Sequence, residues 1–81
     1  MNHLKQFIEQ LNVVYKVTDK PRITFPLNDS NTYLLALELR RSQMALTEQV
    51  KKHGVIPGDG TTVLAEFYQN VYDEIVEMMD E

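Results

Sequence analysis

The fold is decided by a stretch near the end of the chain, residues 62–80, which reads TVLAEFYQNVYDEIVEMMD. Apolar residues recur in it at intervals of four and three, the spacing that forms one stripe on an α-helix. The stripe consists of Leu64, Tyr68, Val71, Ile75 and Met78, widened by Phe67, Tyr72 and Met79. The other side is polar, with Glu66, Gln69, Asn70, Asp73, Glu77 and Asp80. The pattern predicts an amphipathic helix over about 62–80.

A second long helix is predicted over residues 31–53. Cap and turn residues fill positions 27–32, although the sequence does not select one cap among them. The main apolar stripe is Leu35, Leu39, Leu46 and Val50. Lys51, Lys52 and His53 precede Gly54, so cations and a glycine mark the helix end. Antiparallel packing of the two long helices would bring Leu39 near Ile75, and Arg40 and Arg41 beside Asp73 and Glu74.

The pattern of the first 27 residues predicts a short helix followed by a small β-hairpin. Leu4, Phe7, Ile8 and Leu11 share a face, which predicts a short helix over about 2–11. Residues 13–17 and 22–26 are rich in β-branched and aromatic residues around a polar, proline-containing turn. This pattern favours a β-hairpin over about 13–25, with an extended arm over 12–27 as the alternative. The expected fold class is therefore α+β, mainly α, with an antiparallel helical hairpin.

Composition indicates one small acidic domain over residues 1–81. The net charge is −4, all eight basic residues lie in residues 1–53, and residues 54–81 carry seven acids. The absence of cysteine excludes disulfides and thiolate chemistry. No apolar run is long enough for a membrane span, and residues 1–5 do not resemble a signal peptide, so the cytoplasm is the expected compartment. So short a chain buries a marginal core, which favours self-association.

A glycine-rich turn joins the two long helices. Residues 58–65, GDGTTVLA, resemble the phosphate-contacting GDGTT motif of the chaperonins, in which glycines precede a helix whose N-terminal amides face an anion. The resemblance covers eight of 81 residues and lacks the third threonine of that motif. We interpret the turn as a helix cap formed by Asp59, Thr61 or Thr62. Binding of an anion or nucleotide at Gly58, Gly60, Thr61 and Thr62 is the alternative.

Basic residues along the first long helix suggest a second alternative, weak nucleic-acid binding. These residues are Arg40, Arg41, Lys51 and Lys52. An acidic chain with a net charge of −4 lacks the basic footprint of most nucleic-acid-binding proteins. We therefore interpret these side chains as a solvated face.

Apolar and acidic surfaces favour a protein partner. Leu37 and Met44 form a ridge apart from the main stripe, and Tyr33 lies in first turns that are apolar nearly all round. Glu66, Asp73, Glu77 and Met78 offer carboxylates and an adaptable apolar end. No nucleophile stands beside a base, and no cofactor, metal or catalytic residues are expected. We expect a non-enzymatic adaptor, inhibitor or assembly factor that forms a homo-oligomer and binds a protein. Its size would suit a bacterial or bacteriophage-encoded regulator.

Overall fold

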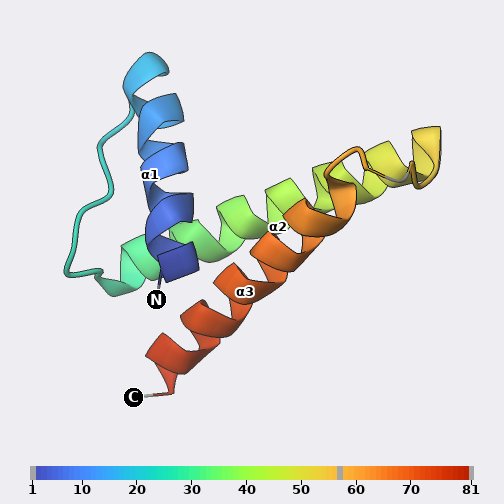
Figure 1. Ribbon diagram of the computed structural model, residues 1–81. Helices are drawn as coiled ribbons and strands as arrows, with labels where there is room; N and C mark the ends of the chain where they lie inside the picture. The colour runs from blue at the N-terminus through green and yellow to red at the C-terminus, as the bar shows by residue number, and fades with distance from the viewer. Residues whose placement is uncertain (1, 57, 81) are drawn as a thin grey trace.

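The computed structural model describes residues 2–56 and 58–80, and this part of the chain forms three α-helices (Figure 1). They are α1 (Asn2–Val17), α2 (Asp29–His53) and α3 (Thr61–Met79). The bounds of α2 and α3 lie within two residues of those predicted for the two long helices. The fold is therefore mainly helical.

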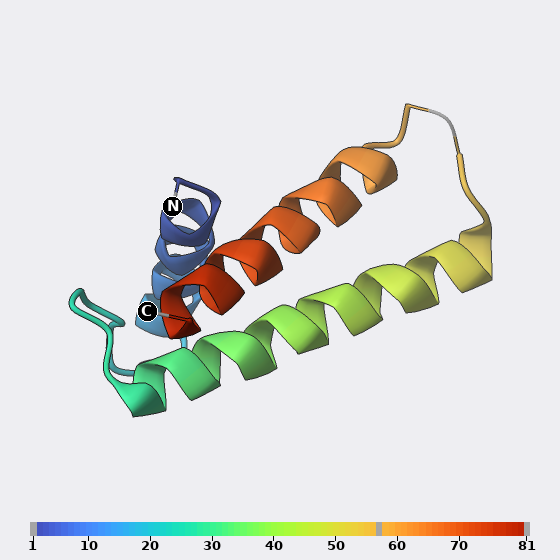
Figure 2. The same ribbon diagram turned by 90° about the horizontal axis from the view of Figure 1, so that it is seen from below.

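The two long helices run side by side in opposite directions (Figure 2). Leu35 and Leu39 of α2 and Val71 and Ile75 of α3 are buried in one core. These four positions belong to the apolar stripes that the helical spacing defines, so the stripes meet. The polar sides of both helices are left toward solvent.

The first helix stands on one side of this pair, with its N-terminal end against α3 (Figure 1). Its buried residues Leu4, Phe7 and Ile8 join the core of the two long helices. The Phe7 ring meets the Tyr68 ring of α3 edge-on, with 6.4 Å between centroids. In Figure 2 α1 lies beside and partly behind the C-terminal part of α3, and α2 lies on the other side of α3.

The predicted β-hairpin over residues 13–25 is wrong, because the described residues contain no strand there and α1 continues to Val17. Buried Tyr15 extends the stripe of Leu4, Ile8 and Leu11 at a spacing of four, so the helical period persists through the valine-rich segment. The valines that suggested a strand lie on the solvent side of this helix. The alternative, an extended arm from residue 12, also fails for residues 12–17.

A left-handed residue ends α1. Asp19 has a φ of 57°, and the Lys20 N–H donates to the Tyr15 carbonyl at 2.7 Å, while the Asp19 N–H reaches the Lys16 carbonyl at 3.4 Å. This pair of bonds is the Schellman ending, with Asp19 where glycine is usual. Pro21 follows two residues later and prevents the helix from resuming.

The segment between α1 and α2, residues 18–28, folds back along α1 in an irregular path that includes a cis Phe25–Pro26 bond. Asn12 of α1 holds it through two hydrogen bonds to one residue. Its side-chain amide donates to the Ile23 carbonyl at 2.9 Å, and its side-chain oxygen accepts from the Ile23 N–H at 2.8 Å. These bonds place the Ile23 side chain in the core.

Specific caps bound the two long helices. The Asn28 side chain accepts from the Asn31 N–H at 2.7 Å and so starts α2. Gly54 ends it with a φ of 73°, a conformation that favours glycine, and donates to the Val50 carbonyl at 2.7 Å. Asp59 accepts from the Thr61 N–H at 2.9 Å at the start of α3.

Candidate interaction face

The side of the α2–α3 pair opposite α1 carries a group of exposed apolar side chains. We call this group the open face and define it by Tyr33, Leu37, Met44, Tyr72, Val76 and Met79. Tyr33 is 68% exposed, Met44 59%, Tyr72 51% and Met79 68%.

Helical spacing explains why these side chains gather. Tyr33, Leu37 and Met44 are separated by four and seven residues, which places them on one flank of α2. Tyr72, Val76 and Met79 are separated by four and three residues and share a flank of α3. Each long helix therefore has two apolar flanks, one buried in the core and one left uncovered.

A groove of about 440 Å³ runs between the two flanks. The α2 wall includes Leu37 and Arg40, the α3 wall includes Tyr72 and Val76, and the core residues Leu39 and Ile75 also line it. Toward the start of α2 a hollow of about 570 Å³ continues the groove, lined by Tyr33, Met78 and Met79 among others. The groove is mainly apolar and open, which suits another helix better than a small polar ligand.

Each long helix has one charged residue in or beside the groove. Arg40 lies on the α2 wall of the groove. On α3, exposed Asp73 is three residues before Val76 and accepts a hydrogen bond from Gln69 at 3.1 Å. Arg40 therefore lines the groove, whereas Asp73, seven residues after Glu66, lies on the rim of α3 outside it.

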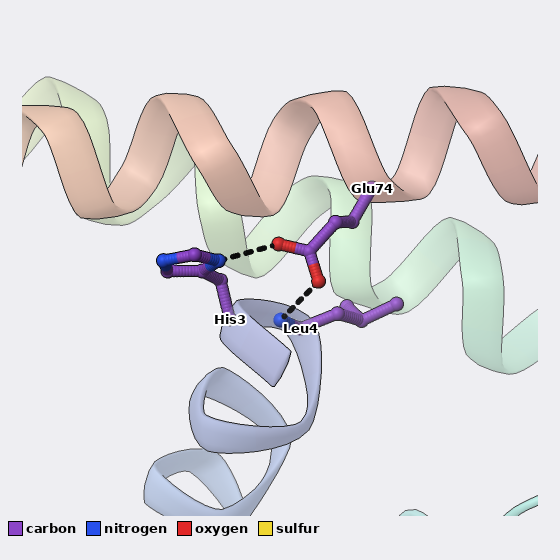
Figure 3. A network of polar contacts seen from close by, with 3 residues as sticks. All are labelled: His3, Leu4 and Glu74. Atoms are coloured by element: carbon purple, nitrogen blue, oxygen red, sulfur yellow. Dashed lines mark hydrogen bonds and ion pairs between the residues drawn. The ribbon is translucent and has the colours of Figure 1, made fainter. Parts of the chain in front are cut away.

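Glu74 does not lie beside Arg40 and Arg41, so that predicted pairing is wrong for this residue. Its carboxylate is turned toward α1, where it accepts from the Leu4 N–H at 3.3 Å and meets the His3 Nδ1 at 2.9 Å (Figure 3). Arg41 instead pairs with Glu38 on its own helix at 3.0 Å. Position 74 falls on the flank of α3 that packs against α1, three residues after Val71.

The environment of Glu74 favours its charged form. Glu74 is only 8% exposed, and this burial raises the pKa of its carboxyl group. The hydrogen bonds that the carboxylate accepts, among them those from the Leu4 amide and His3, outweigh burial and lower the pKa overall. The carboxylate sits at the N-terminal end of α1, where the helix dipole is positive. Glu74 is therefore a cap for α1 supplied by another helix.

The remaining residues predicted to bind a partner occupy different places. Glu66 and Glu77 are exposed on α3 and share one flank with Asp73, at spacings of seven and four residues, outside the groove. Met78 is partly buried and packs against the core, and it also lines the hollow beside Tyr33. The structure brings Tyr33, Leu37 and Met44 together on one flank, and leaves Glu66 and Glu77 apart from them.

The glycine turn contains its own anion. The Asp59 carboxylate accepts from the first N–H of α3, and contacts with the side chain and amide of Thr61 hold the pKa of Asp59 below its usual value. A bound phosphate would have to displace this carboxylate or lie beside it against electrostatic repulsion. This geometry argues against anion binding at Gly58, Gly60, Thr61 and Thr62.

The basic residues of α2 differ in their surroundings. Arg41 pairs with Glu38, and Lys51 lies 3.8 Å from Glu48. Arg40 lies on the wall of the groove, whereas Lys52 is exposed in the last turn.

Among the residues that the structure describes, no group of three or more acidic, histidine or cysteine side chains could hold a metal ion.

The sequence patterns do not identify three residues of the open face. The apolar spacing predicts Tyr72 and Met79 at the edge of the core stripe of α3 and makes no prediction for Val76. Their spacing of four and three was a visible signal for a second apolar flank. The pattern alone does not say which flank the neighbouring helices cover.

No family model, curated protein or solved structure matches the sequence. No helix in the described ranges, 2–56 and 58–80, combines the length and apolar character needed to cross a membrane. The open face and the charges near it are the features of the molecule that bear on its function.

Proposed function

We propose that this protein is a non-enzymatic interaction protein whose open face binds the apolar side of a helical segment of another polypeptide chain. The observation that carries the proposal is the second apolar flank on each long helix, uncovered by α1. Contiguous exposed apolar surface of this kind marks interaction sites. A protein that works in this way acts as an adaptor, an inhibitor or an assembly factor.

The shape of the open face supports a helical partner. The side chains of two adjacent helices form ridges with a groove between them, into which the ridge of a third helix packs at 8–10 Å. Covering the open face would remove six large apolar side chains from water, each contributing on the order of 1 kcal/mol because each is only partly exposed. Exposed carboxylates on α3 would favour a partner with basic residues beside its apolar side.

We also propose the cytoplasm as the compartment. A chain without cysteine is suited to a reducing environment, where disulfides do not form. The proposed mode of action requires no redox chemistry and no cofactor.

A photo-cross-linking amino acid at position 72 tests the proposal. It is placed in the full chain, the cells that produce the protein are irradiated, and adducts are separated by mass. We expect a discrete adduct with a polypeptide, which Val76→Asp abolishes without loss of helical circular dichroism. The same probe at Glu66, on the flank of α3 outside the groove, is the matched control. Equal adducts at both positions, or none at position 72, would contradict the proposal.

A further inference from the structure

The protein exposes more surface than a folded chain of this size usually does. The molecule measures 38 × 32 × 18 Å, and its radius of gyration is 13.6 Å against about 12 Å for a compact domain of 81 residues. Its accessible surface is 6201 Å², whereas about 5,000 Å² is usual for a folded monomer of this mass. The surplus exceeds the roughly 800 Å² that each partner buries in a typical stable interface.

We infer that a second copy of this chain covers the open face, in a symmetric pair whose two-fold axis runs along the groove. The inference rests on the proposed function and names its partner. Rotation about this axis lays α2 of one copy over α3 of the other. The four long helices then form a bundle in which each helix runs antiparallel to both neighbours.

The apolar residues of the open face suit this arrangement. Leu37 of α2 and Val76 of α3 both line the groove, so they lie at similar levels along it. Rotation about an axis along the groove leaves these levels unchanged. Leu37 of each copy therefore faces Val76 of the other, and the α2 flank of one copy covers the α3 flank of the other.

The charges favour this axis over a two-fold axis that runs across the groove. Arg40 lines the groove with Tyr72 and Val76, which lie on either side of Asp73 in sequence. The proposed rotation brings Arg40 of one copy level with Asp73 of the other, twice in each pair. A two-fold axis across the groove would instead lay α2 on α2 and α3 on α3, which places like charges together. Such like-charge contacts disfavour an interface.

Sedimentation equilibrium tests whether the pair forms. We expect the purified full chain to change from monomer to dimer between about 1 μM and 0.5 mM, with a dissociation constant in the micromolar range. Val76→Asp places a charge in the interface and should leave a monomer of unchanged helical content. A wild-type chain that remains monomeric at about 0.5 mM overturns the inference.

Exchanging the charges tests the direction of the axis. Arg40→Asp and Asp73→Arg should each weaken self-association by roughly tenfold, because each sets two like-charge pairs across the interface. Mixing the two single variants should restore association as a heterodimer, since both pairs are then opposite in charge. Glu9→Arg, which makes the same change on the exposed side of α1, should have little effect.

The outcomes separate this inference from the proposed function. The proposed axis is overturned if Arg40→Asp and Asp73→Arg do not weaken the dimer. It is also overturned if both variants weaken the dimer but mixing them does not restore association. A monomeric wild type whose position-72 probe captures a different polypeptide overturns the second copy as partner, while the proposed function stands. A monomer without any adduct specific to position 72 overturns both.

Discussion

At the scale of the residue, Glu74 joins α1 to α3. Its carboxylate meets the Leu4 N–H and His3 at the N-terminal end of α1, where backbone N–H groups have no partner within their own helix. A charged acceptor at this place satisfies one such group and interacts favourably with the helix dipole. The carboxylate therefore joins two elements that are 70 residues apart in the chain.

Replacing Glu74 by Gln should lower stability in a pH-dependent manner. The folded-state pKa of Glu74 lies below its usual 4.5, so its stabilisation is complete above the unfolded-state value and is lost as pH falls through the folded-state value. Glutamine still accepts a hydrogen bond but carries no charge, and we expect a loss of about 1 kcal/mol at pH 7. Urea denaturation at pH 7, 5 and 3 should show this difference shrinking toward pH 3. Glu77→Gln, at an exposed position on α3, is the control, and a difference that stays constant with pH would contradict the assignment.

Replacing Asp19 by Gly should stabilise the protein. Asp19 has a φ of 57°, a conformation that glycine adopts without the steric cost that a side chain imposes. We expect Asp19→Gly to raise the free energy of unfolding by about 0.5–1 kcal/mol, and Asp19→Ala to lower it. Chemical denaturation of the three proteins at pH 7 measures both changes. Stabilisation by alanine as well would show that the left-handed residue is not the cause.

At the scale of the element, α1 and the segment after it behave as one unit. The segment, residues 18–28, contains no helix or strand, and the two bonds between Asn12 and Ile23 connect it to α1. Ile23 then fills part of the core beneath the helix. An irregular segment can be ordered in this way because a side-chain amide supplies the donor and acceptor that a neighbouring strand would supply.

Replacing Asn12 by Ala should release this segment. Both backbone groups of Ile23 would lose their partners, and we expect a loss of about 2 kcal/mol in stability. Hydrogen exchange at the Ile23 amide should accelerate more than at the amides of Val71 and Ile75 in α3. Asn12→Asp keeps the acceptor but not the donor, so its loss should be intermediate. Unchanged exchange at Ile23 in Asn12→Ala would refute this account of the segment.

At the scale of the whole molecule, the flat shape and the two apolar flanks have the same consequence. Three helices of this length bury one core at the point where they meet, and one side of the α2–α3 pair has no covering layer. Helical domains ordinarily bury each apolar flank against another element. A second copy of the same chain supplies that layer in the proposed dimer.

Thermal stability should therefore depend on protein concentration. Association that occurs only in the folded state raises the apparent melting temperature as concentration increases. Between about 10 and 500 μM we expect an increase of several degrees for the wild type. Val76→Asp should show no such increase, and a wild-type melting temperature independent of concentration would contradict the paired state.

The sequence patterns allowed only part of α1 to be predicted. The spacing of Leu4, Ile8 and Leu11 indicated its first turns, and buried Tyr15 continues the same period. The β-branched residues Val13, Val14 and Val17 favoured a strand, because strand propensity describes residues that suit a half-buried surface. In the structure these valines face solvent on a helix, so tertiary packing of the opposite flank outweighed their local preference.

The sequence by itself determined the two long helices, since regular stripes of apolar residues, a run of cap residues at 27–32 and the glycine at position 54 specify helices whatever surrounds them. The same spacing placed Leu37 and Met44 on one flank. Only the structure selected Asn28 as the cap. Only the tertiary structure decided which flank α1 covers, and with it the inward position of Glu74 and the exposure of Tyr72 and Val76. The physical reason is that periodicity orders residues around one helix axis, whereas burial depends on where a second and a third helix lie.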